Sequence, residues 1–206
     1  GSIDLIREAK RRGIKVTCET TPHHFSLADE AVKNFDTNTK VNPPLRTRKD
    51  VEAIKKGLKD GTIDCIATDH APHSIEEKEV EFDFAPFGMV GLETMLPLLL
   101  TQVGCGRLTI RKLVHLTCEN PAEVYHIESR GSLEEGSFAD ITVVDLKRES
   151  KIDASKFYSK AKFSPFDGLK VKGVAVKTFV NGQPVMDEGE IVARLGTGRI
   201  VRSRVD

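Results

Sequence analysis

Three ionisable side chains with a spacing suited to catalysis follow a short, mostly apolar run near position 65. Asp69, His70 and His73 come directly after residues 63–67. Carboxylate and imidazole groups can bind zinc, and they can accept and donate protons near neutral pH. A plainer interpretation is a loop in which Asp69 caps the next helix and the histidines are merely polar. We favour the catalytic interpretation.

The run over residues 63–67 has the composition of a strand that is buried on both faces of a parallel sheet. Pro72 ends any further strand pairing, because proline has no N–H to donate. In a β/α barrel, the active site lies at the C-terminal ends of the strands. The sequence therefore predicts an α/β fold in which Asp69 stands at such a strand end.

A second unit of the same kind precedes this one. Residues 2–12 have helical apolar spacing with Gly13 as a stop, and residues 14–19 follow as a predicted strand. This strand ends in polar residues that include His23 and His24. Neighbouring residues of an extended segment point to opposite sides, so at most one of the two histidines would face a site. We interpret both as hydrogen-bonding residues that shape the strand end, with a metal ligand as the alternative.

The segment over residues 40–46 is predicted to be rigid and extended because it contains two consecutive prolines. It holds Asn42 and Arg46 in fixed directions, which suits either ligand binding or a stiff connector. Further predictions are a short helix (27–35), an amphipathic helix (49–58), a mobile acidic surface loop (74–83) closed by residues 85–88, an apolar helix (91–103), and two short helices (109–116 and 121–125), the last with Asn120 as its N-cap.

The pattern changes to strands after Glu128. A hairpin is predicted over residues 174–186, because Asn181-Gly182 is a strong turn signal between two strand-like runs. We therefore divide the chain into a βα portion, residues 1–128, and a β-rich accessory segment, residues 129–206, whose basic end from Gly196 is predicted to be loose.

Composition excludes several classes of function. The 206 residues carry 31 basic and 31 acidic side chains, so nothing favours nucleic acid or an anionic membrane as a partner. Apolar runs are too short for a membrane span, and the charged start over residues 1–13 does not have the pattern of a signal peptide. The cysteines are widely spaced, which indicates reduced thiols in a cytoplasmic protein: Cys18, Cys65, Cys105 and Cys118. We expect Cys18 and Cys65 to lie within buried strands.

Four segments together resemble the bacterial type I dihydroorotases of the amidohydrolase superfamily. They are Thr-Thr-Pro-His-His at residues 20–24, Asn-Pro-Pro-Leu-Arg at 42–46, Asp-Cys-Ile-Ala-Thr-Asp-His-Ala-Pro-His at 64–73, and Ala-Pro-Phe-Gly-Met-Val-Gly-Leu-Glu-Thr at 85–94. Residues 131–140 and 164–168 look like the C-terminal β segment of that superfamily. The resemblance covers nearly the whole chain.

The resemblance implies a (β/α)8 TIM barrel with a centre of two zinc ions. It implies that this chain is the C-terminal part of the barrel, about strands seven and eight with their helices, plus a small C-terminal β segment. Asp69 corresponds to the metal ligand and proton carrier of the last strand, whereas His23 and His24 do not correspond to metal ligands of the family. Asn42, His73 and the backbone of Phe87 and Gly88 correspond to groups that hold the substrate.

The implied reaction is the reversible hydrolysis of the cyclic amide of dihydroorotate to N-carbamoyl-aspartate, in pyrimidine biosynthesis. The chain departs from the family because it contains no His-x-His pair, and because only Asp69 is matched to a metal ligand. It opens where the helix after strand six would begin. We therefore expect it to be inactive unless the N-terminal part of the barrel, or a chain of the same family, completes the site.

Two alternatives remain. One is a related cyclic amidase, an allantoinase or hydantoinase, which would share the Asp-His strand end and differ in the substrate pocket. The other is a non-catalytic chain that serves as an assembly partner of aspartate transcarbamoylase.

Overall fold

The computed structural model describes residues 1–203, and these residues divide into two units. The first unit comprises residues 1–95 and 151–170, and the second comprises residues 96–150 together with the chain from residue 171 onward. Each unit is described separately below. The boundary that we draw at residue 128 from the strand pattern stays a prediction.

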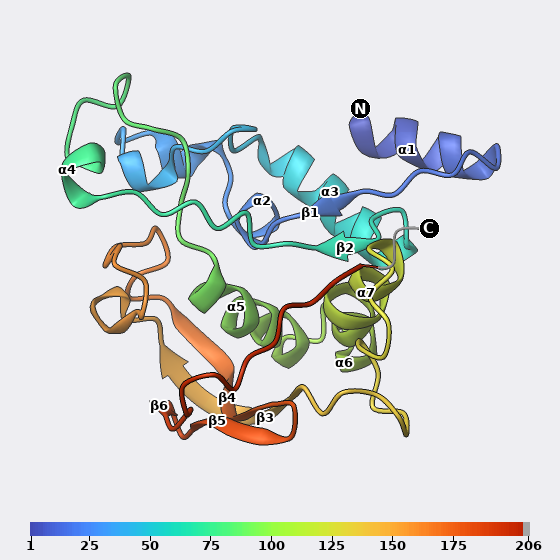
Figure 1. The fold of residues 1–206 in the computed structure, drawn as a ribbon. Coiled ribbons are helices and arrows are strands. Elements are labelled where there is room, and N and C mark those ends of the chain that lie inside the picture. Colours follow the sequence, from blue (N-terminus) through green and yellow to red (C-terminus); the bar gives the residue numbers. More distant parts are fainter. Residues whose placement is uncertain (204–206) are drawn as a thin grey trace. The chain divides into compact units, whose positions relative to one another are not determined.

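Two short parallel strands, β1 (Glu19–Thr20) and β2 (Cys65–Ile66), lie at the centre of the first unit (Figure 1). Glu19 pairs with Cys65, and Thr20 pairs with Ile66. The parallel pairing agrees with the predicted β/α arrangement. The prediction of strands over the whole of residues 14–19 and 63–67 is wrong, because the ladder within the described residues is only two pairs long. Ile14 lies outside it and is 52% exposed.

The helices of the first unit follow the apolar pattern. Helix α1 (Ser2–Arg11) ends just before Gly13 at φ 76°, and α3 (Arg48–Asp60) ends at Gly61 at φ 80°. Glycine suits both positions because the left-handed backbone clashes with a Cβ atom. Helix α3 confirms the predicted amphipathic helix and buries Val51 and Leu58.

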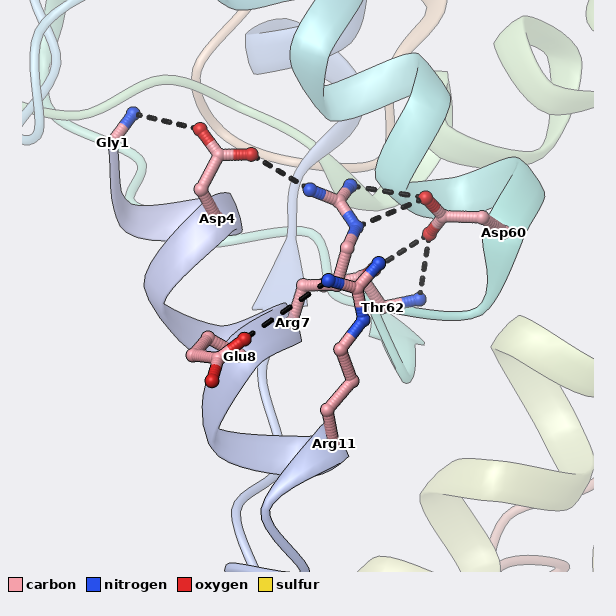
Figure 2. A network of polar contacts seen from close by, with 7 residues as sticks. All are labelled: Gly1, Asp4, Arg7, Glu8, Arg11, Asp60 and Thr62. Atoms are coloured by element: carbon pink, nitrogen blue, oxygen red, sulfur yellow. Dashed lines mark hydrogen bonds and ion pairs between the residues drawn. The ribbon is translucent and has the colours of Figure 1, made fainter.

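Polar contacts join α1 to the end of α3, as Figure 2 shows. The Arg7 guanidinium lies 2.7 Å from the Asp4 carboxylate and 3.0 Å from that of Asp60. Asp60 also accepts hydrogen bonds from the backbone N–H and the hydroxyl of Thr62, which leads into β2. Ion pairs at a surface contribute about 0–1 kcal/mol each, so this network orients the helices more than it stabilises them.

A second polar cluster fastens the two strands at their N-terminal side. Lys10 Nζ lies 2.6 and 2.7 Å from the carboxylate oxygens of Asp64, and it also donates to Thr62 O at 2.9 Å. Asp64 accepts a hydrogen bond from the Cys18 N–H at 2.8 Å. Cys65 lies in β2 and is buried as predicted, whereas Cys18 lies just before β1 and is only partly buried, which corrects the prediction for Cys18.

The segment after β1 is helical, which corrects the extended conformation predicted for His23 and His24. Thr21 caps helix α2 (Pro22–Ser26) by accepting from the His24 N–H, and Pro22 occupies the first turn, where its missing N–H costs nothing. The helix predicted over residues 27–35 is only the single 3-10 turn η1 (Asp29–Val32), and a second such turn, η2 (Thr37–Thr39), follows.

The prediction of a mobile acidic surface loop over residues 74–83 is also wrong in part, because a short helix forms within it. Ser74 and Glu77 form a capping box that begins the one-turn helix α4 (Ile75–Lys78). Lys78 at its end is only 3% exposed. A buried lysine at this place means that the segment is anchored from within, although its other side chains are mostly exposed.

Helix α5 (Leu92–Gly104) confirms the apolar helix prediction, and in the second unit it is followed by α6 (Ile110–Val114). The predicted break at Asn120 is wrong. A π-helical turn, η3 (His115–Glu119), joins α6 directly to α7 (Asn120–Val124), and Asn120 has helical φ −63° and ψ −43°. Asn120 is therefore not an N-cap, since its backbone continues the helix.

The strands β3 (Ile141–Lys151), β4 (Lys170–Val180), β5 (Gln183–Asp187) and β6 (Glu190–Ile191) form one sheet in that order (Figure 1). Asn181 at φ 50° and Gly182 at φ 75° form the predicted hairpin turn. A 3-10 turn, η4 (Ala154–Lys156), lies in the connection from β3 to β4. The predicted loose end falls partly on residues 204–206, outside the described residues. Among the described residues, no helix combines the length and apolarity that a membrane span requires.

Candidate active site

Asp69 stands just beyond the C-terminal end of β2, in the first unit. Its backbone has φ 48°, a left-handed conformation that is uncommon outside glycine and is best tolerated by Asp and Asn. Its side chain is exposed, and we find no hydrogen-bond partner for the carboxylate among residues 1–203. The turn therefore presents a free carboxylate at the strand end.

His70 is held by the beginning of α5. Its Nδ1 accepts from the backbone N–H of Gly91 at 3.0 Å and of Leu92 at 3.4 Å. Because Nδ1 accepts, the proton of the neutral ring is on Nε2. Gly91 is required here, since a Cβ atom would lie 2.7 Å from the Thr68 carbonyl oxygen. The ring of His70 thus fixes the turn that carries Asp69.

Three of the predicted substrate-binding residues are in direct contact. His73 Nε2 lies 3.0 Å from Phe87 O, and it must donate because a carbonyl oxygen only accepts. Gly88 has φ 138°, and a Cβ atom there would lie 2.7 Å from both the Cβ and the carbonyl oxygen of Ala71. Glycine at position 88 therefore lets the segment containing Phe87 lie against the strand end.

Asn42 is exposed and precedes a cis peptide bond to Pro43. The loop around it is held by His24, whose Nε2 donates to Pro43 O at 2.9 Å and whose Nδ1 lies 2.7 Å from the Thr21 hydroxyl. No hydrogen bond joins Asn42 to Asp69 or His73 among the described residues. His24 thus has the hydrogen-bonding role predicted for it.

His23 was predicted to be a hydrogen-bonding residue, with a metal ligand as the alternative. Its side chain is 2% exposed, and its Nε2 is buried with no hydrogen-bond partner among residues 1–203. Burial, and then the neighbouring His24, lowers the pKa of His23 to about 3, so the ring is neutral at neutral pH. A buried neutral imidazole with an unused nitrogen is the form that binds metal ions. Thr21-Pro22 is the sequence signal that a helix begins here, and this helix replaces the extended conformation predicted for His23 and His24.

Two buried lysines that the sequence did not single out lie beside Phe87 and Gly88. Lys78 is 3% exposed and Lys40 is 9% exposed. Burial, and then the nearby Lys40, lowers the pKa of Lys78. Both lysines donate to backbone carbonyl groups of the segment that holds Phe87. Their burial could have been suspected only from the three-dimensional arrangement, because each lies in a polar stretch of sequence.

Metal-binding groups are few in the part of the chain that the structure describes. No group of three or more His, Cys, Asp or Glu side chains there is arranged to hold a metal ion. Two donors without a described partner are the Asp69 carboxylate after β2 and His23 Nε2 after β1. They follow the C-terminal ends of adjacent parallel strands.

Comparison with known proteins assigns the chain to a family. Residues 1–185 match the model of the amidohydrolase family, to which this chain therefore belongs. A dihydroorotase of Acetivibrio thermocellus is 58% identical over 188 residues, which are 91% of this chain and 44% of that protein. A dihydroorotase of Geobacter sp. (strain M21) is 55% identical over 189 residues, 92% of this chain and 44% of that protein. The chain thus spans less than half the length of these relatives.

Solved structures show the same fold. An L-hydantoinase (dihydropyrimidinase) of Arthrobacter aurescens superposes with a TM-score of 0.93 at 37% identity, covering 97% of this chain and 46% of that one. A dihydropyrimidinase of Brevibacillus agri superposes with a TM-score of 0.91 at 25% identity, covering 98% of this chain and 46% of that one.

Proposed function

We propose that this chain supplies the Asp69 side of the active site of a cytoplasmic dihydroorotase. The observation that carries the proposal is the Asp69 turn, which presents a free carboxylate at a strand end, in a chain 58% identical to a dihydroorotase over 91% of its length. In this proposal, β1 and β2 are the seventh and eighth strands of a (β/α)8 barrel, and the remaining strands come from outside the residues described here.

The donor atoms present fit a zinc centre that other residues complete. Asp69 is the proposed ligand from the last strand. His23 has no counterpart among the metal ligands that the resemblance implies, but it is a second candidate here, because a buried ring nitrogen without a partner is costly unless something binds it. When bound, the proposed pair of zinc ions would supply a hydroxide nucleophile and polarise the amide carbonyl group of the substrate.

Asp69 is the group in this chain that can move the proton. Hydrolysis forms a bond from the hydroxide oxygen to the ring carbonyl carbon and breaks the bond from that carbon to the ring nitrogen. Asp69 accepts the proton of the hydroxide and passes it to the leaving nitrogen, acting first as base and then as acid. His70 holds the turn of Asp69, while Asn42, His73 and the backbone of Phe87 and Gly88 bind and orient the ring.

A hybrid enzyme tests this function. In the hybrid, this chain replaces the matching 44% of the Acetivibrio thermocellus dihydroorotase. We expect the hybrid to hydrolyse dihydroorotate, and to form it from N-carbamoyl-aspartate, with little activity on hydantoins or allantoin. We expect this substrate preference because the chain is 58% identical to a dihydroorotase over 91% of its length.

A hydantoinase or allantoinase is the second candidate function, favoured by the fit to the L-hydantoinase of Arthrobacter aurescens at a TM-score of 0.93. Preference of the hybrid for hydantoin or allantoin over dihydroorotate would replace our proposal with this one. Lack of activity on all these substrates, in a folded hybrid, would instead favour a non-catalytic role such as assembly with aspartate transcarbamoylase.

We expect His23→Phe to lower the zinc content of the hybrid from about two ions per chain to about one, because phenylalanine fills the space and offers no ligand atom. Metal analysis of the purified protein measures this, with circular dichroism as the test of folding. His115→Phe is the matched control, since His115 is paired with Glu119 at 2.8 Å on a helix of the second unit. Unchanged zinc in His23→Phe would remove His23 from the metal centre.

A further inference from the structure

Residues 82–88 form a segment whose carbonyl groups converge on two ammonium groups, and we call it the lysine-held segment. Lys78 Nζ donates to Pro86 O at 3.0 Å and to Gly88 O at 2.9 Å. Lys40 Nζ donates to Phe82 O at 2.7 Å and to Asp83 O at 3.0 Å. Both ends of the segment are thus fastened from inside, each by one lysine.

Burying these two charges requires the carbonyl groups to stay in place. Lysine is rarely buried without a partner, because an ammonium group that leaves water must recover its hydrogen bonds. Among residues 1–203, neither Lys40 nor Lys78 forms an ion pair with a carboxylate. The carbonyl oxygens therefore serve as their counter-groups, and the rings of Phe82 and Phe87 lie 5.3 and 4.8 Å from Lys40 Nζ.

The same contacts fix the backbone that faces the candidate site. Phe87 lies between the two residues whose carbonyl groups Lys78 holds, and its own carbonyl oxygen accepts from His73 at 3.0 Å. The Gly88 N–H donates to Lys40 O at 2.9 Å. The N–H of Phe87 has no acceptor among the described residues, so it is a backbone donor of this segment that is left for a ligand.

We propose that Lys78, together with Lys40, fixes the backbone on both sides of Phe87 and so positions the Phe87 N–H for binding a polar ring atom of the substrate. This inference rests on the proposed function, because it assigns the lysines to the same site. Neither lysine touches the substrate in this account. Each acts through the backbone of the lysine-held segment.

Substitution of Lys78 by methionine tests the proposal. Methionine matches the length of the buried stem and removes the ammonium group that holds Pro86 and Gly88. In the hybrid enzyme we expect Lys78→Met to raise KM for dihydroorotate by about 10- to 100-fold, with a smaller effect on kcat, because misplaced binding groups weaken substrate binding. If Lys78 only stabilised the fold, Lys78→Met would instead reduce the fraction of active enzyme. Apparent kcat would then fall while KM stayed unchanged.

Amide hydrogen exchange on this chain gives a second measurement that does not depend on activity. We expect Lys78→Met to speed exchange at residues 85–89 while leaving α3 unchanged. Lys33→Met is the matched control, because Lys33 is exposed and its side chain has no described partner. It should alter neither KM nor exchange.

The outcomes separate the two proposals. An active wild-type hybrid in which Lys78→Met leaves KM and segment exchange unchanged would overturn the positioning role and leave the proposed function standing. The wild-type hybrid could instead fail to hydrolyse dihydroorotate while Lys78→Met still speeds exchange in the lysine-held segment. That result would show that Lys78 holds the segment, and it would reject both the assigned substrate and the role of the segment in binding it.

Discussion

Asp69→Asn is expected to reduce dihydroorotate turnover by the hybrid enzyme by about 10²- to 10⁴-fold, the range that general acid–base groups contribute. Asparagine keeps the size of the side chain but cannot carry the proton from the attacking hydroxide to the ring nitrogen. It also tolerates the left-handed backbone at φ 48°, so the turn should persist. Steady-state kinetics in both reaction directions measure the loss, with hydrogen exchange as the test that the strand end is intact.

Asp29→Asn is the matched control for this substitution, because Asp29 is an exposed aspartate of the same unit whose carboxylate has no described partner. It should retain full turnover. Normal activity in Asp69→Asn, or an equal loss in both variants, would remove Asp69 from the chemistry and leave the first unit without a candidate proton carrier.

Gly88→Ala is expected to lower kcat/KM of the hybrid by about 100-fold, because displacements near 1 Å at a site can cost that much. The new Cβ atom would lie 2.7 Å from the carbonyl oxygen of Ala71, so either the strand end or the lysine-held segment must move. Movement of the segment breaks the contact between His73 and Phe87. Kinetics with dihydroorotate measure the effect.

Gly61→Ala separates this displacement from backbone strain alone. Gly61 has φ 80°, and a Cβ atom there would meet nothing within 4 Å. Alanine at either position is strained by the positive φ, which typically costs about 1 kcal/mol of stability. Only Gly88→Ala should impair substrate binding. Equal kinetic losses in both variants would mean that loss of stability, and not the close approach at Ala71, explains the defect.

The sequence predicted those parts of the fold whose signals are local. Helices α1, α3 and α5 follow their apolar spacing, and Asn181-Gly182 forms the predicted hairpin turn. The strands before Asp69 and Thr21 were predicted too long. Strand length depends on pairing partners elsewhere in space, and within the described residues β1 and β2 pair only with each other.

The site shows the same division. Asp69 and His73 could be singled out from their residue types at a strand end, and Phe87 and Gly88 from the resemblance to dihydroorotases. The structure brings His73, Phe87 and Gly88 together. The burial of Lys78 could not be predicted from the sequence, because its neighbours in the chain are acidic and exposed. Its partners are backbone carbonyl groups eight and ten residues away. The extended conformation expected for His23 is wrong because Thr21 and Pro22 begin a helix there.

A crystal structure of the hybrid enzyme with zinc and dihydroorotate bound is the most direct test of the central claim. Our account predicts that an Asp69 carboxylate oxygen lies about 2.0–2.2 Å from a zinc ion, the usual distance for this ligand type. It also predicts that the substrate ring contacts Asn42, His73 and the Phe87 N–H. A zinc centre that excludes Asp69, or a substrate bound away from the lysine-held segment, would contradict the account.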